Sequence, residues 1–316
     1  MSRPVRLPSL LALGITALAL GAVPAAQADR LETPVAGGAN LASAAGWQAW
    51  SAEQPDGTHR LRLRRPDGTV ITPAIAAFGA PVDPAIGTRG GADGVNTPAS
   101  RRLSAVYSRC AGPSSLSGCD VHALDLTTLD EARVRALATR AYSETAPSLN
   151  LGNWSVVRRG GGPRPGVYAY SERRARLLRL SPTLARETAT SQSRAAFSYR
   201  SLPRGSDRSA GSGFGVQIRQ SSGEGRPLVA ASRLDRLPVS LQLTRYRAGW
   251  LVPRPGATRV FTTLRFAGSG GPFTLTVREA PRTLPAGVLS AAGDASTLFT
   301  RYLDAAGIQR IDPAIR

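Results

Sequence analysis

The sequence predicts an all-β fold, and within that class a β-propeller of six blades. Short runs in which apolar and polar residues alternate are separated by Gly- and Pro-rich turns over most of the 316 residues, which is the pattern of strands and hairpins. These runs group into six similar units, and a recurrence of about 40–60 residues built from short strands is typical of propellers. Equivalent residues follow one another at spacings of 57, 50, 41, 53 and 49 residues: Ala49, Val106, Val156, Phe197, Trp250 and Phe299.

Residues 1–28 have the features of a cleaved secretory signal peptide. Arg3 and Arg6 form the positive region, residues 10–23 the apolar region, and Ala26-Gln27-Ala28 a small-x-small cleavage site. A membrane anchor needs about 20 apolar residues, and this run is shorter. We therefore expect one mature domain, residues 29–316, that is secreted to the periplasm or the cell exterior and has no membrane span.

The first unit consists of WQAWSAE, HRLRLRR and TVITP, joined by the turns Pro55-Asp56-Gly57 and Pro66-Asp67-Gly68. Pro presets φ and Gly accepts a positive φ, so Pro-Asp-Gly favours a tight turn. In HRLRLRR, Leu61 and Leu63 face one way and the arginines between them the other. That alternation predicts a half-buried strand.

The second unit follows a Gly/Pro-rich connection, residues 74–99, in which we expect an inner strand near residues 75–78. It contains LSAVYSR, DVHALDL and EARVRAL, although residues 129–140 are also compatible with a short helix. Cys110 and Cys119 flank the hairpin between the first two runs, and in an oxidising compartment they predict a disulfide. Closing a loop of this length stabilises a fold by about 2–3 kcal/mol in the chain-entropy model.

The remaining units repeat this layout. The third has SETAPSL followed by strands at residues 154–158, 167–171 and 177–180, the fourth has RAAFSYR, FGVQIRQ and PLVAAS, and the fifth has VSLQLTRY, AGWLVPR, TRVFTTLRFA and FTLTVRE. The sixth, with AGVLSA, STLFTRYL and IQRID, lacks an outer strand. We expect residues 32–41 to supply it and so close the ring without an exposed edge. The alternative architecture is two tandem β-sandwich domains divided near Glu144, since sandwich strands have similar lengths; six matched units favour the propeller.

The repeated units, such as SETAPSL, NWSVVRR, GVYAYSE and RLLRL, together with the Pro-Asp-Gly turns, resemble the six-bladed TolB-like and WD-repeat-like propellers of secreted bacterial proteins. The resemblance covers most of the mature chain. Pro-Asp-Gly occurs only in the first unit, and no Trp-Asp pair ends a strand. The resemblance implies recognition of a protein or polymer on the faces of the ring, and it names no catalytic residue.

No residue pattern in the sequence indicates catalysis, a metal or a cofactor. The two histidines, His59 and His122, lie in segments with strand-like alternation, and a G-x-S-x-G elbow is absent. Two cysteines and one histidine lack the fourth ligand of a zinc site, and no Asp-rich calcium loop is present. We therefore expect no metal and no cofactor. The sequence favours a non-enzymatic recognition or scaffold module; the alternative is a hydrolase or lyase that acts on an envelope polymer in the central channel.

The charge of the chain is concentrated in one segment. All 40 basic residues are Arg, and residues 153–265 contain 21 of them against 5 acids, whereas the rest of the mature chain has 17 against 16. Such asymmetry suggests an acidic partner; the alternative is a soluble basic face that reflects codon bias. Equivalent hairpins of units three to five would bring eight arginines to one face of the ring. These are the candidate binding residues: Arg158, Arg159, Arg164, Arg200, Arg204, Arg208, Arg254 and Arg259.

Arginine forks bind carboxylates and phosphates. The expected partner is therefore an acidic protein or an anionic cell-envelope polymer, with nucleic acid less favoured. The oligomeric state is not predicted.

Overall fold

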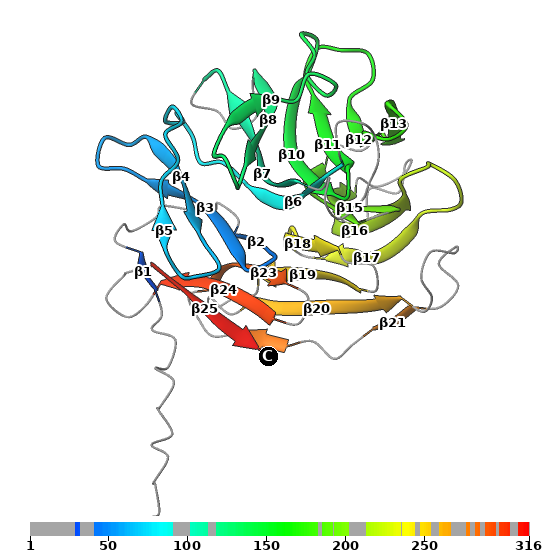
Figure 1. Cartoon of the computed structure of the whole chain (residues 1–316). Coiled ribbons are helices and arrows are strands. Elements are labelled where there is room, and N and C mark those ends of the chain that lie inside the picture. The colour runs from blue at the N-terminus through cyan, green and yellow to red at the C-terminus, as the bar shows by residue number, and fades with distance from the viewer. Residues whose placement is uncertain are drawn as a thin grey trace, which may run out of the picture.

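The fold is all-β, with its sheets arranged around a common middle. A computed structural model of the chain describes residues 29–31, 41–90, 102–112, 118–182, 185–191, 193–201, 213–234, 236–243, 247–253, 259–266, 276–278, 282–284, 288–294, 297–303 and 309–315, with strand backbone only for 29–31 and beyond 252. These residues form 25 strands in six antiparallel sheets. β2, β6, β10 and β18 lie toward the middle, and β9, β13 and β21 lie at the periphery (Figure 1). The predicted β-propeller is confirmed.

The first and second sheets follow the predicted units. In each, four strands pair in chain order from the middle outward. The first sheet consists of β2 (Ala42–Ala44), β3 (Trp47–Glu53), β4 (His59–Arg64) and β5 (Val70–Ile71), and the second of β6 (Ala85–Arg89), β7 (Arg102–Cys110), β8 (Cys119–Asp125) and β9 (Glu131–Arg133).

The third and fourth sheets have the same order. The third consists of β10 (Ser143–Asn150), β11 (Asn153–Arg159), β12 (Gly166–Ser171) and β13 (Arg176–Ser181), and the fourth of β14 (Ala185–Ser191), β15 (Arg194–Ser201), β16 (Gly213–Gln220) and β17 (Leu228–Leu234). Glu144 lies inside β10, the first strand of the third sheet. The alternative of two sandwich domains divided near Glu144 is therefore wrong.

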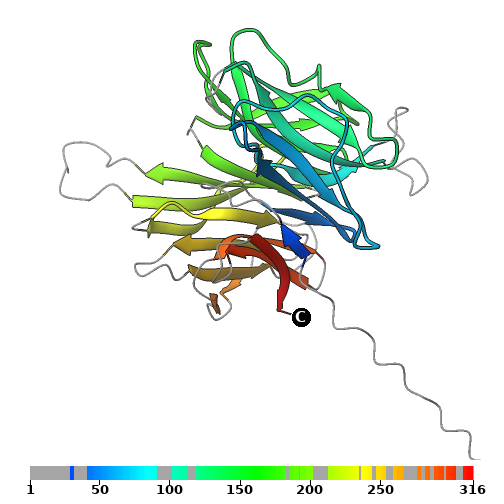
Figure 2. The ribbon, with the colours of Figure 1, turned by 90° about the vertical axis from the view of Figure 1, so that its left-hand side faces the viewer.

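The fifth sheet has the order β18-β19-β20-β21, with β22 also paired to β20, and the sixth has the order β1-β25-β24-β23. β1 pairs antiparallel with β25, and Figure 2 shows the two strands, blue and red, beside each other. The fifth sheet consists of β18 (Val239–Leu243), β19 (Arg247–Pro253), β20 (Arg259–Phe266), β21 (Thr276–Arg278) and β22 (Arg282–Leu284); the sixth of β1 (Asp29–Leu31), β23 (Val288–Asp294), β24 (Thr297–Leu303) and β25 (Gln309–Ile315).

The six residues predicted to be equivalent all lie in the second strand of a sheet. Ala49, Val106, Val156, Phe197, Trp250 and Phe299 belong to β3, β7, β11, β15, β19 and β24. All four tryptophans also lie in such strands, and three of them, Trp50 in β3, Trp154 in β11 and Trp250 in β19, are each 1% exposed. The repeat that the sequence predicts is therefore a repeat of sheets.

Three local predictions need correction or completion. Residues 75–78 are not a strand: Ile75 and Phe78 are buried in the connection that precedes β6, and β6 is the inner strand. Residues 131–133 form a strand and not a helix. β14 was not predicted, because its sequence, ARETATS, has no apolar alternation. Residues 1–28 and 32–40, which include the predicted signal peptide and most of the predicted closing strand, lie outside the described residues.

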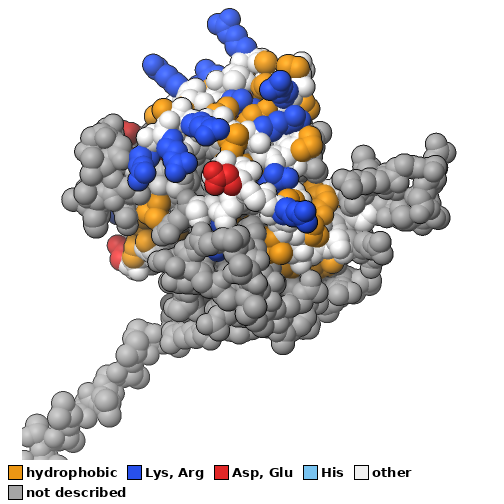
Figure 3. Space-filling view, turned by 90° about the vertical axis from the view of Figure 1, so that its right-hand side faces the viewer, with side chains coloured by type: hydrophobic (Ala, Val, Ile, Leu, Met, Phe, Trp, Pro, Cys, Tyr) orange, Lys and Arg blue, Asp and Glu red, His pale blue; other side chains and the backbone are white. Residues whose placement is uncertain are grey.

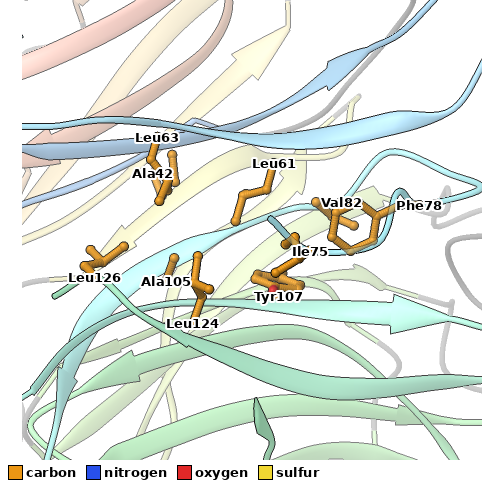
Figure 4. Packing of buried hydrophobic residues seen from close by; sticks show 11 residues of the cluster. Ala42, Leu61, Leu63, Ile75, Phe78, Val82, Ala105, Tyr107, Leu124 and Leu126 are labelled. Carbon is orange, nitrogen blue, oxygen red and sulfur yellow. The ribbon is translucent and has the colours of Figure 1, made fainter. Parts of the chain in front are cut away.

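An apolar cluster of eleven buried residues joins the first sheet to the second. Leu61 and Leu63 of β4 face Ala105 and Tyr107 of β7 and Leu124 of β8 (Figure 4). Both leucines are fully buried, while the arginines that alternate with them are partly exposed. The half-buried strand predicted from HRLRLRR is thus confirmed.

The second and third sheets approach closely at Gly87 in β6. A Cβ atom at this position would lie 1.9 Å from the carbonyl oxygen of Leu149 in β10. Any side chain would force the two inner strands apart, so glycine is required here. This requirement also explains why β6 lacks the apolar signature of an inner strand.

The predicted disulfide is present. Cys110 and Cys119 are bonded and form the register pair that closes the hairpin between β7 and β8. A disulfide fits an oxidising compartment. Within the described residues, no helical segment has the length and apolar composition needed to cross a bilayer.

Candidate anion-binding surface

Arg158, the first predicted binding residue, is held inside the third sheet. Its side chain is 8% exposed, and its Nη2 donates a hydrogen bond to the carbonyl oxygen of Leu137 at 2.9 Å. Its guanidinium carbon lies 4.9 Å from the ring centroid of Tyr168 and 5.5 Å from that of Tyr142. Its Nε lies 3.4 Å from Oε1 of Glu144, a fully buried carboxyl whose pKa is raised by burial. Arg158 is therefore engaged within the fold.

Arg159 connects the third sheet to the fourth. Its Nε donates to the hydroxyl of Thr145 at 3.2 Å, and its Nη2 donates to the carbonyl oxygen of Ala185, the first residue of β14. Burial lowers the pKa of the guanidinium. Arg159 thus fixes the position of the adjacent inner strand.

Arg164 and Arg200 are exposed. The register pairs Arg158 with Gly166 and Arg200 with Phe214, so both exposed arginines lie at the hairpin end of equivalent strands in neighbouring sheets. Arg204, Arg208 and Arg254 lie outside the described residues, and Arg259 begins β20, for which only the backbone is described. Of the predicted binding residues, Arg164 and Arg200 are therefore the two that the structure describes as exposed, and both lie at the same end of their strands.

The third and fourth sheets expose six arginines that were not among the predicted binding residues. Arginine side chains gather over the outer edge of these sheets (Figure 3). Among the described residues of the two sheets and their turns, eight arginines are exposed: Arg164, Arg173, Arg174, Arg176, Arg179, Arg186, Arg200 and Arg226.

The acids of the same region are mostly turned into the protein. Oε1 of Glu172 accepts hydrogen bonds from Nε of Arg89 at 2.9 Å and from the indole of Trp154 at 3.1 Å, and its Oε2 accepts from the backbone of Gly90 at 2.8 Å. Glu187 is 7% exposed, and its Oε2 accepts from the backbone N–H of Leu241 at 3.0 Å. Among the described acids of the two sheets, only Glu224 is exposed. The positive charge of this surface is therefore largely uncompensated.

A hollow of about 310 Å³ lies between the third and fourth sheets. It is formed by the turns at the Asn153 and Ser171 end of β11 and β12, the end opposite to the hairpin of Arg164. Its lining contains three arginines and no acid, and comprises Leu151, Asn153, Ala169, Tyr170, Ser171, Arg173, Arg174, Arg176, Leu178, Ser193, Gln220, Ser221 and Ser222. The sequence signal for it is the basic turn Glu172-Arg173-Arg174-Ala175-Arg176, which was not among the predicted site residues.

A second polar group lies in the second sheet and has a structural role. Oε1 of Glu131 accepts a hydrogen bond from the hydroxyl of Tyr107 at 2.7 Å and from Nη2 of Arg109 at 2.7 Å, and Nδ1 of His122 lies 3.5 Å from the same oxygen. Desolvation lowers the pKa of His122 and outweighs the attraction of Glu131. No group of three or more His, Cys, Asp or Glu side chains among the described residues is placed to bind a metal ion.

The comparisons with known proteins concern the fold. No family model matches the chain, and no curated protein matches it. Among solved structures, the chain is similar to a triple arginine-to-alanine mutant of AofleA from Arthrobotrys oligospora, with 11% identity over 92% of this chain and 90% of that chain and a TM-score of 0.54.

Two further structures are similar at the same level. A mutant of the Aleuria aurantia lectin in complex with Fucα1-6GlcNAc shares 10% identity over 90% of this chain and 97% of that chain, with a TM-score of 0.53. A chain of the mitotic checkpoint complex shares 12% identity over 97% of this chain and 100% of that chain, with a TM-score of 0.51. The structures similar to this chain are β-propellers. At these identities the likeness establishes the fold, and the chain is a β-propeller.

Proposed function

We propose that this protein is an exported, non-enzymatic propeller that recognises an anionic cell-envelope polymer or an acidic protein. The observation that carries the proposal is the charge of the surface of the third and fourth sheets, whose described residues include eight exposed arginines and one exposed acid. A concentrated field of one sign attracts ligands of the opposite sign. Guanidinium groups also bind carboxylates and phosphates in a bidentate manner.

A binding role is better supported than the alternative of a hydrolase or lyase with its site in the central channel. On the inner strands whose side chains are described, the carboxylates are those of Glu144 and Glu187, and both are buried. Glu144 accepts a hydrogen bond from the hydroxyl of Thr139 at 2.8 Å, and Glu187 accepts one from Leu241. Carboxylates engaged in this way act as structural partners and not as a catalytic pair.

The proposal includes the finer architecture and the location. Each of the six sheets is one blade, the pairing of β1 with β25 closes the ring, and the relationship is to TolB-like or WD-repeat-like propellers. The six four-stranded or larger sheets support this arrangement. Residues 1–28 act as a cleaved signal peptide, and the Cys110–Cys119 disulfide supports an extracytoplasmic location.

The similar solved structures are compatible with recognition. One is a lectin in complex with a fucosylated sugar, and another belongs to a complex of proteins. Propellers of this shape therefore occur both as sugar-binding proteins and as parts of assemblies. The arginine-rich surface is what directs the proposal for this chain toward an anionic ligand.

Retention of the mature protein on heparin resin across a salt series tests the proposal. We expect retention at low salt, with an affinity that falls steeply as salt rises because each arginine–anion contact releases a counterion. A variant in which Arg164, Arg179, Arg200 and Arg226 are replaced by Gln should elute at clearly lower salt, with a slope reduced by up to about four contacts.

The matched control removes the same charge from the first and second sheets. Arg65, Arg102, Arg135 and Arg140 are also exposed, and replacing these four by Gln should shift elution much less. Equal shifts for the two variants would mean that only net charge matters. Absence of retention of the parent protein at low salt would contradict the proposed function.

A further inference from the structure

The hollow between the third and fourth sheets has the size of a single ligand unit. Its volume of about 310 Å³ lies at the lower end of the about 300–1,000 Å³ typical of small-molecule sites. It adjoins the arginine-rich surface, since three exposed arginines of that surface, Arg173, Arg174 and Arg176, line it. A polymer lying along the arginine-rich surface can therefore place one of its residues in the hollow.

Its charge selects an anion. Arg173, Arg174 and Arg176 are exposed, and none of them has a hydrogen-bond or ion-pair partner among the described residues. The acid in the same turn, Glu172, is turned toward Arg89 and Trp154 in the opposite direction. The three guanidinium groups are thus available to a carboxylate, for which the guanidinium fork has matching geometry.

The rest of the lining supplies partners for hydroxyl groups. Ser193, Ser221 and Ser222 come from two turns of the fourth sheet, and the backbone N–H of Ser221 donates to the carbonyl oxygen of Ser193 at 2.8 Å, which fixes the turns to each other. The Oγ of Ser221 is buried and has no hydrogen-bond partner among the described residues. Buried hydroxyls normally have a partner, and a ligand hydroxyl or a water in the hollow can provide it.

One wall of the hollow is apolar and firmly placed. Leu178 lines it, is half-buried, and packs against Ala169 and against Ala195 of the fourth sheet. The neighbouring side chain of Tyr170 packs on the opposite face of the third sheet. Gly223, with a φ of +80°, packs against Leu178 so closely that a Cβ would lie 2.5 Å from its Cδ2. This contact holds the turn of the fourth sheet against the third. An aliphatic side chain suits the C–H face of a sugar ring, which a bare phosphate or sulfate ion does not have.

We propose that the hollow binds one carboxylate-bearing sugar residue, a uronic acid unit, of an anionic polysaccharide. The arginines bind the carboxylate, the serines bind ring hydroxyls, and Leu178 contacts the ring. The inference rests on the proposed function, because it names the chemical unit that the arginine-rich surface recognises. It places that unit at the end of β11 and β12 where Asn153 pairs with Ser171, and not at the opposite end, where Arg164 and Arg200 lie.

Calorimetric titration with a galacturonic acid trisaccharide, with the neutral galactose trisaccharide and with inorganic phosphate tests the assignment. The parent protein should bind the galacturonic acid trisaccharide more tightly than either other probe. Replacing Arg173 and Arg176 by Gln should weaken this binding about tenfold to a hundredfold, which corresponds to about 1.4–2.8 kcal/mol. The matched control, Arg65→Gln with Arg135→Gln, removes the same charge from exposed positions in the first and second sheets and should weaken it less than about threefold.

A charge-neutral variant provides a second test. Ser193 is exposed at the rim of the hollow, and Ser193→Trp should fill the space and abolish trisaccharide binding while circular dichroism shows an unchanged fold. Equal effects of the two arginine pairs, or binding of the neutral trisaccharide or phosphate as tight as that of the acidic one, would overturn the inference. If the parent protein is retained on heparin but does not bind the trisaccharide, the inference is wrong and the proposed function stands. If the parent protein shows neither heparin retention nor trisaccharide binding, both the inference and the proposed function are contradicted.

Discussion

The contact between the first and second sheets differs in kind from that between the third and fourth. The former is one apolar cluster of eleven buried residues. The latter combines two small apolar clusters of four and three buried residues with a buried group of hydroxyls. In that group the Oγ of Ser155 donates to Oγ1 of Thr188 at 2.8 Å and contacts Oγ1 of Thr190, and Ser148 accepts from the backbone of Thr190 at 2.9 Å.

The two contacts hold neighbouring sheets together by different physical means. Apolar burial is non-directional and scales with area, so it stabilises the pair without fixing the register finely. Hydroxyl bonds contribute less net free energy, about 0.5–1.5 kcal/mol each, but they require defined distances and angles. The hollow is formed where the third and fourth sheets meet, so its shape depends on the directional contact. The structure thus separates a region built for stability from a region built for a defined relative position.

The largest expected effect is at the apolar contact. Leu61→Ala removes a fully buried side chain of the first sheet and should lower the free energy of unfolding by about 2–5 kcal/mol, because it loses burial and leaves a cavity. Urea unfolding followed by circular dichroism measures this. Val70→Ala, in the same sheet but at a side chain that is 40% exposed, is the control and should change stability by about 0.5 kcal/mol or less. A similar loss for both variants would contradict the assignment of stability to this cluster.

A smaller effect is expected at the hydroxyl contact. Ser155→Ala removes the partner of Thr190 and should lower the free energy of unfolding by about 1–3 kcal/mol, since a buried hydroxyl is left unsatisfied. It should also weaken binding in the hollow, whereas Leu61→Ala should not change binding by the folded protein. Ser232→Ala, at an exposed position in β17, is the matched control. Unchanged stability and binding in Ser155→Ala would show that the hydroxyl group does not set the relative position of the two sheets.

The smallest effect is a pH dependence confined to the first two sheets, which contain both histidines. Desolvation lowers the pKa of His59 and of His122. Since the pKa of each histidine is lower in the folded protein than in the unfolded chain, its contribution to stability is fully present above the unfolded-chain pKa of about 6.5. That contribution is lost as the pH falls through the pKa of the folded protein. Unfolding free energies at about pH 7.5 and about pH 5.5, on either side of the ordinary histidine pKa, should therefore differ, with lower stability at the acid pH.

The double variant His59→Gln with His122→Gln should flatten this dependence, since neither side chain then titrates. Ser155→Ala lies in sheets without histidine and should keep the slope of the parent protein. The same slope in the double variant would show that the dependence comes from other groups, such as the carboxyls of Glu131 or Glu144.

Much of the fold could be predicted because its strands carry local signals. HRLRLRR alternates, the glycine-rich and proline-rich segments mark turns, and the six equivalent residues from Ala49 to Phe299 repeat. β6 and β14 escaped prediction because tertiary contacts decide their composition. Gly87 must be glycine to admit Leu149, and Thr188 and Thr190 are polar because their hydroxyls pair with Ser155.

The candidate site was less predictable, because the local sequence of a turn does not indicate which turn of another sheet lies beside it. The charge excess pointed to the segment that carries the exposed arginines of the third and fourth sheets, but sequence spacing could not tell exposed arginines from engaged ones. Arg158 looks equivalent to Arg164 in the sequence, yet Leu137 and Tyr168 enclose it. Arg173 and Arg176 line a hollow only because Ser193 and Ser221 of the next sheet lie beside them.

The buried tryptophans give the fold three internal optical reporters. Trp50, Trp154 and Trp250 are each 1% exposed and lie in the second strands of the first, third and fifth sheets. A shielded indole fluoresces at shorter wavelength than one in water, so a variant that keeps a single one of them reports the opening of one sheet alone. Coincident transitions would mean that the ring unfolds as a unit. Separate transitions would mean that alternate sheets open independently and that the hollow can be lost while the apolar half stays folded.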